Sequence, residues 1–108
     1  MKMAGEYLNN ILPREVQKRL EQGEKLNLLD VREQDEWESG HIPGAKHIPL
    51  GTIDERRKEL DPDKETIVIC RSGNRSGLAC EYLESMGYKV VNMQGGMSEW
   101  SGDIEYGK

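Results

Sequence analysis

The chain has 108 residues, with 15 Lys and Arg against 20 Asp and Glu, and a formal net charge of −5. This length suits a single domain over residues 1–108, with a core of about 7–101, and the acidic balance argues against nucleic acid or an anionic membrane as a partner. Two cysteines, Cys70 and Cys80, are too few for a disulfide-rich scaffold and lack zinc-ribbon spacing. We expect a cytoplasmic protein, because no apolar run suits a signal peptide or a membrane span.

The first half of the chain predicts a helix, a strand and then shorter elements. A helix is expected over residues 13–22, because Pro13 suits the first helical position and Val16 and Leu20 fall on one face. The apolar run at 26–29 predicts a buried strand. Four shorter elements follow: a helix over 33–39, a turn at 41–44, a strand over 46–49 and, from a capping-box pattern, a charged helix over 52–60.

The second half repeats this alternation. Residues 66–69 form the clearest strand prediction, because all four are β-branched. A loop over 71–76 and a helix over about 76–86 follow. The expected apolar face of this helix comprises Leu78, Ala79, Tyr82, Leu83 and Met86. A strand over 89–93, a turn at Gly95-Gly96 and a helical turn over 97–100 complete a small α/β/α domain with a mostly parallel sheet.

Two chemically interesting residues close predicted strands. Asp30 ends the strand at 26–29, and Cys70 ends the strand at 66–69. In open parallel sheets, ligands bind outside the carboxyl ends of the strands. We therefore expect Asp30 and Cys70 to lie near one crevice.

The segment 70–76, Cys-Arg-Ser-Gly-Asn-Arg-Ser, carries the strongest chemical signal. Gly73 and Asn74 tolerate a positive φ, so the backbone can curl and point successive N–H groups inward. The following helix adds its free N–H groups and its positive dipole end, and Arg71 and Arg75 add two cations. Such a loop would stabilise a thiolate on Cys70 and would equally hold an anionic substrate.

With its flanking motifs, this segment resembles the single-domain rhodaneses. The motifs are Leu28-Leu29-Asp30-Val31-Arg32, Glu36-Trp37, Gly40-His41-Ile42-Pro43-Gly44-Ala45, Ile48-Pro49, the loop from Cys70 to Ser76 and Gly95-Gly96-Met97. The resemblance covers residues 28–100, most of the chain. It implies a three-layer α/β/α fold with a five-stranded, mainly parallel sheet.

The resemblance also implies a sulfurtransferase. Sulfane sulfur would move from thiosulfate, or a related small anionic donor, through a persulfide on the catalytic Cys70 to a thiol or cyanide acceptor. The remaining loop residues would bind the substrate: Arg71, Ser72, Gly73, Asn74, Arg75 and Ser76. Sulfite leaves without a general acid, and no cofactor or metal is expected. A partner protein or fused domain stays open as a further partner.

The charged residues near the strand ends are expected to have different roles. Asp30 and Arg32 should support the site by pairing with each other and tying down the loops, rather than by transferring protons. Arg75 should brace the active loop by pairing with a carboxylate. Arg71 should face incoming anions.

The second cysteine and the two histidines are expected to be structural. Cys80 lies in the helix and is more typical of buried filler than of a second reactive thiol. His41 follows a glycine in a turn and should be hydrogen-bonded, whereas His47 should lie on the surface. We do not expect these side chains to form a metal site with Cys70.

Two other functions compete with sulfur transfer. Cysteine phosphatases and arsenate reductases also place a Cys–Arg anion cradle after a strand, but with five residues between Cys and Arg, whereas four separate Cys70 from Arg75. The shorter loop makes a smaller ring of N–H groups, which suits a sulfur atom better than a tetrahedral oxyanion. A non-catalytic interaction module is the third possibility, although inactive relatives typically lack the cysteine.

Overall fold

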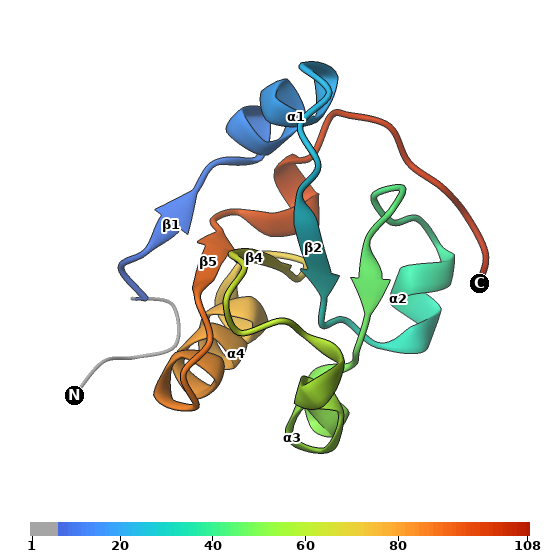
Figure 1. Cartoon of the computed structure of the whole chain (residues 1–108). Coiled ribbons are helices and arrows are strands. Elements are labelled where there is room, and N and C mark those ends of the chain that lie inside the picture. Colours follow the sequence, from blue (N-terminus) through green and yellow to red (C-terminus); the bar gives the residue numbers. More distant parts are fainter. Residues whose placement is uncertain (1–6) are drawn as a thin grey trace.

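The computed structural model describes residues 7–108, which form a five-stranded sheet in the order β1-β5-β4-β2-β3 (Figure 1). The strands are β1 (Asn10–Ile11), β2 (Asn27–Asp30), β3 (Lys46–His47), β4 (Thr66–Ile69) and β5 (Val90–Met93). The helices are α1 (Pro13–Glu21), α2 (Gln34–Glu38), α3 (Ile53–Arg56) and α4 (Asn74–Ser85), with 3₁₀ helices η2 (Leu50–Thr52), η3 (Arg57–Glu59) and η4 (Gly96–Glu99). Neighbouring strands pair in parallel, which confirms the predicted sheet.

Alternate residues of the strands pack into two cores, one on each face of the sheet. In β4, Val68 joins the core that contains Leu83 of α4, whereas Ile67 and Ile69 join the core that contains Val16 of α1. Helices α3 and α4 therefore cover one face, and α1 with η4 covers the other (Figure 1). Within residues 7–108, no helix has the length and apolar character needed to cross a membrane.

Strand β4 lies in the middle of the sheet and places Cys70 at its carboxyl end. All four of its residues are buried, as expected for a central strand covered on both faces. The last residue of β2, Asp30, is the register partner of Ile69. The structure therefore confirms that Asp30 and Cys70 lie at the carboxyl ends of neighbouring strands.

Several short elements differ from the sequence prediction. Strand β1, which is too short to show an apolar pattern, is not predicted; it pairs with β5. The helix expected over 52–60 is divided into η2, α3 and η3, and Thr52 Oγ1 donates to the Pro49 carbonyl instead of capping a helix. The strand expected over 46–49 keeps only Lys46–His47, and the one expected over 26–29 lies one residue later.

Helix α4 begins two residues earlier than predicted, and its buried face is different. Its buried positions include Ser76, Ala79, Cys80 and Leu83, a run at i, i+3, i+4 and i+7 with mostly small side chains. The predicted apolar face is therefore wrong at two positions. Leu78 and Met86 are 47% and 44% exposed.

Candidate active site around Cys70

Cys70 is the first residue after β4, and its side chain lies inside the curled loop. Its Sγ accepts a hydrogen bond from the Gly73 backbone N–H at 3.0 Å and lies 3.2 Å from the Ser76 hydroxyl oxygen. The residue is only 1% exposed. A sulfur anion at this position is therefore surrounded by hydrogen-bond donors rather than by bulk water.

Gly73 makes the turn that allows this geometry. It is the N-cap of α4 and has a φ of +103°, in the left-handed region that only glycine adopts at little cost. A side chain at this position would also contact the backbone nitrogen of Gly95 at 3.3 Å. Because α4 starts directly after Gly73, the free N–H groups of its first turn and its positive dipole end adjoin the loop.

The loop is held from behind by the turn that follows β5. The backbone N–H groups of Met97 and Ser98 donate to the carbonyls of Cys70 and Arg71, each at 2.9 Å. A Cβ on Gly96 would overlap the Cys70 carbonyl oxygen and would lie 2.6 Å from that of Arg71. The first carbonyls of the loop are therefore bound to η4, while the Gly73 N–H faces the sulfur. The sequence pattern identifies Gly95-Gly96 only as a turn and does not predict this support.

Arg75 braces the loop against α2, as predicted. Its guanidinium binds Glu36 in a bidentate pair, with N–O distances of 2.7 and 2.8 Å. This pair lowers the pKa of the Glu36 carboxyl to about 2. Sequence reasoning predicts a carboxylate partner without identifying Glu36, which lies 39 residues away along the chain.

Asp30 and Arg32 form the expected pair at the end of β2. Both are buried, and the Arg32 Nε and Nη2 atoms donate to the Asp30 carboxylate at 2.8–3.1 Å. Arg32 Nη2 also donates to the Gly40 carbonyl at 2.8 Å. This geometry ties the end of β2 to the segment after α2, which favours support over proton transfer.

Both histidines pack against Trp37. The rings of His41 and Trp37 stack with centroids 3.5 Å apart, and His41 Nδ1 lies 2.8 Å from the Trp37 carbonyl oxygen. The hydrogen bond predicted for His41 is therefore confirmed. The prediction of a surface position for His47 is wrong. It is half-buried, stacks on Trp37 and has its Nε2 atom 2.7 Å from the Arg32 carbonyl oxygen.

A cavity of about 340 Å³ lies beside the loop and gives it an open, polar approach. It is lined by Arg32, Glu36, Ser39, Arg71, Met97 and Ser98. Arg71 is exposed, and no carboxylate within residues 7–108 forms an ion pair with it. Its charge is therefore available to an anion that enters this cavity, as the sequence predicts.

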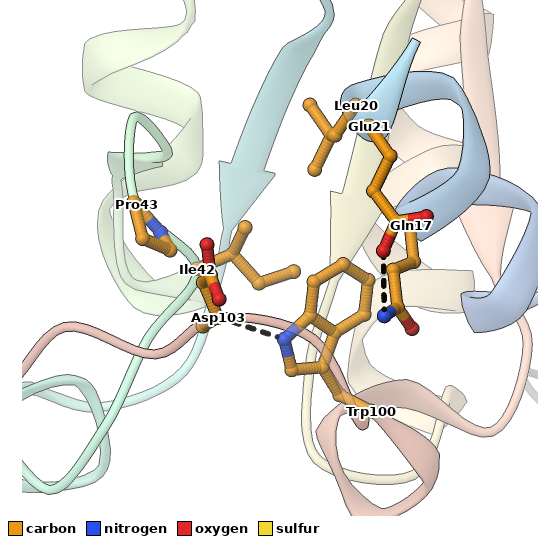
Figure 2. A pocket seen from close by; sticks show the side chains of 7 residues that line it. All are labelled: Gln17, Leu20, Glu21, Ile42, Pro43, Trp100 and Asp103. Carbon is orange, nitrogen blue, oxygen red and sulfur yellow. Dashed lines mark hydrogen bonds between the residues drawn. The ribbon is translucent and has the colours of Figure 1, made fainter.

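A second pocket, of about 230 Å³, is unrelated to the cysteine. Figure 2 shows Trp100 between Ile42 and Gln17, with the indole N–H donating to the Asp103 carbonyl at 3.0 Å. Neither Cys70 nor any other residue of the loop lines this pocket. The polar cavity, which Arg71 of the loop lines, is therefore the better candidate for the reaction.

Cys80 has none of the surroundings that distinguish Cys70. It is fully buried in the core under α4, and burial is the main cause of the raised pKa of its thiol. The structure thus places it as core filler, as predicted. In the described part of the chain, no group of three His, Cys, Asp or Glu side chains could hold a metal ion.

One further polar residue adjoins the loop, and sequence reasoning missed it. Asn92 of β5 is 5% exposed, and its side chain bonds to Ser76, Gly73 and Asn10. An asparagine in the middle of an otherwise apolar strand is the signal that could have identified it.

Comparison with known proteins gives consistent relatives. The family model described as rhodanese-like domain matches residues 12–103. A putative sulfurtransferase, YtwF, of Bacillus subtilis is 47% identical over 90 residues, which cover 83% of this chain and 87% of that protein. The putative sulfur carrier protein YrkF of the same organism is 44% identical over 88 residues, covering 81% of this chain but only 48% of the relative.

Solved structures agree with this result. The crystal structure of a rhodanese-like domain protein from Staphylococcus aureus superposes with a TM-score of 0.88 at 31% identity. The match covers 94% of this chain and all of that one.

Proposed function

The chain belongs to the rhodanese-like domain family, and on this basis we propose that it is a sulfurtransferase that carries sulfur as a persulfide on Cys70. One observation carries the proposal. Cys70 Sγ accepts a hydrogen bond from the Gly73 N–H, while the first two carbonyls of the loop accept hydrogen bonds from η4. This arrangement stabilises negative charge on sulfur, both on the free thiolate and on the outer sulfur of a persulfide.

The first half-reaction loads the cysteine. The Cys70 thiolate attacks the outer sulfur of thiosulfate, a new S–S bond forms, and the bond within thiosulfate breaks with its electron pair leaving on sulfite. No proton is transferred, so the site needs no general acid. Arg71 attracts the dianionic donor, and Ser72 and Asn74 line the exposed side of the loop.

The second half-reaction transfers the outer sulfur from Cys70 to the acceptor. An acceptor thiolate, or cyanide in an assay, attacks the outer sulfur, and the Cys70 thiolate leaves. The relatives named sulfur carrier and adenylyltransferase/sulfurtransferase support a partner protein as the acceptor. Throughout the cycle, the Glu36–Arg75 pair holds the loop in place, and the Asp30–Arg32 pair holds the neighbouring end of β2. Free thiols at both cysteines suit a reducing, cytoplasmic location.

Mass spectrometry tests the proposal directly. Intact protein treated with thiosulfate should gain the mass of one sulfur atom, and cyanide should remove it with release of thiocyanate. The Cys70→Ser variant should gain nothing under the same conditions. Turnover of an aryl phosphate without any sulfur adduct would instead identify the cysteine-phosphatase alternative.

A further inference from the structure

The Ser76 hydroxyl has two acceptors and one proton. Its oxygen lies 2.5 Å from Asn92 Oδ1 and 3.2 Å from Cys70 Sγ. A hydroxyl group donates only one hydrogen bond at a time, and its proton rotates to suit its surroundings. The Asn92 amide and the Cys70 sulfur therefore compete for the same donor.

The orientation of the Asn92 amide is fixed by its other contacts. Its Nδ2 atom lies 3.2 Å from the Gly73 carbonyl oxygen and 3.1 Å from Asn10 Oδ1. A carbonyl only accepts, so the nitrogen must face Gly73 and the oxygen must face Ser76. Asn92 is buried, and within residues 7–108 its Oδ1 atom accepts a hydrogen bond from the Ser76 hydroxyl. Leaving this oxygen unpaired costs free energy, so the amide holds the hydroxyl away from the sulfur.

We infer that Asn92 is a positioning residue that sets, through the Ser76 hydroxyl, the balance between the free thiolate and the persulfide of Cys70. The part of the inference that concerns the persulfide rests on the proposed function, and the part that concerns the thiolate does not. In the thiolate, the charge lies on Sγ, within reach of the hydroxyl. In the persulfide, Sγ is bonded to carbon and sulfur and is neutral, while the charge lies on the outer sulfur.

The hydroxyl therefore serves the two states differently. When Cys70 is a thiolate, the proton of Ser76 turns toward Sγ and leaves Asn92 Oδ1 without a donor. When the persulfide forms, the proton returns to Asn92. Asn92 thus makes the thiolate less favourable than it would be with a free hydroxyl, and it shifts the site toward the loaded form.

Alkylation of Cys70 tests the competition without any sulfur donor. We would measure the rate with iodoacetamide against pH, resolving Cys70 from Cys80 by peptide mapping. Asn92→Leu frees the hydroxyl, so the midpoint of the pH profile should fall by about one pH unit, the equivalent of one hydrogen bond to a charged group. In a Ser76→Ala background, the same substitution should produce no shift, because no hydroxyl remains to be freed.

The controls separate this effect from a loosened loop. Asn10→Ala removes an acceptor of Nδ2 and leaves the Asn92–Ser76 bond intact, so it should not move the midpoint. The other charged or ionisable groups around Cys70 are Arg71, Arg75 with Glu36, and the buried Cys80, and none of them is altered. If Asn92→Leu does not fold, Asn92→Val, a β-branched residue suited to a strand, replaces it in the same cycle.

Equal shifts in the two backgrounds, or no shift in either, would overturn the inference. The effect on the persulfide is measured separately, as the fraction of protein that carries added sulfur in mixtures of thiosulfate and sulfite. Half of the Asn92→Leu protein should carry added sulfur only at a ratio of thiosulfate to sulfite about tenfold higher than the wild type requires. A wild type that never gains sulfur refutes the proposed function. An alkylation shift still present in such a protein would leave the hydroxyl competition standing.

Discussion

Cys70 and Cys80 lie ten residues apart in the same core cluster, and both are almost completely buried, at 1% and 0% exposure. Their surroundings differ in polarity. Cys70 Sγ meets a backbone N–H and a hydroxyl, whereas Cys80 lies on the buried face of α4, and burial is the main cause of its raised pKa. The proposed catalytic cysteine therefore differs from the second one in the hydrogen-bond donors around its sulfur and not in its exposure.

The largest expected difference is between substitutions of the two cysteines. Cys70→Ser should abolish sulfur transfer from thiosulfate and leave the fold intact, because a hydroxyl is too weakly acidic to replace the thiolate. Cys80→Ala should keep most of the activity and lose only core packing. Steady-state thiocyanate formation with circular dichroism measures both. Equal losses in the two variants would contradict the contrast.

The support behind Cys70 can be removed without touching either cysteine. Gly96→Ala forces a Cβ into the carbonyls of Cys70 and Arg71, so stability should fall by about 3 kcal/mol and activity at least about tenfold. Gly44→Ala is the matched control. Gly44 also has a positive φ of +84°, but its Cβ would meet nothing within 4 Å, and the cost should be about 1 kcal/mol with activity unchanged. Urea denaturation and kcat/KM report the two effects. Similar activities in these variants would show that η4 does not shape the loop.

The Glu36–Arg75 pair should have a smaller effect that depends on pH. The pKa of Glu36 is lowered to about 2 in the folded protein, so the pair contributes its full stability above the ordinary value of 4.5. That contribution is lost as the pH falls toward 2. Between these values, the wild type should lose about 1 kcal/mol more stability than Glu36→Gln, since the pair is partly exposed.

The same variant sharpens the contrast between the cysteines. Because Arg75 braces only the active loop, Glu36→Gln should slow alkylation of Cys70 a few-fold and leave Cys80 unreactive. Chemical denaturation at several pH values and peptide mapping provide the measurements. Parallel pH profiles for wild type and variant would show that the pair adds no stability.

The smallest effect is expected at Arg71, which touches neither sulfur. Arg71→Ala should lower kcat/KM for thiosulfate about threefold, because the charge beside the cavity attracts the donor, and raised salt should narrow the gap by screening. Stability should not change. Identical salt responses in the two proteins would remove the steering role and leave the contrast between the cysteines untouched.

The local parts of the site could be predicted from the sequence. Gly73 and Asn74 after a β-branched strand are enough to indicate a curled loop that opens a helix, and the pairing of Asp30 with Arg32 spans only two residues. The contacts that were missed join distant segments. Glu36 reaches Arg75 from α2, Asn92 reaches Ser76 from β5, and no periodic pattern encodes either meeting.

The fold follows the same division between local patterns, which the sequence reveals, and distant contacts, which it does not. Strands β2, β4 and β5 carry apolar runs and were found to within one residue, because each is buried on both faces. Strand β1 has two residues and no such run, and its place is decided by pairing with β5. The error at Leu78 and Met86 has a related cause. Helix α4 packs largely through small residues, and a rule based on large apolar side chains adds Leu78 and Met86 to the buried face.

The hydrogen bonds from η4 to the loop also set an order of events during folding. Cys70 leaves the ribosome well before Met97 and Ser98, whose N–H groups hold the first two carbonyls of the loop. Until β5 has joined the sheet, those two carbonyls lack the donors that η4 supplies. The loop therefore reaches its final shape only after β5 and η4 have folded against it.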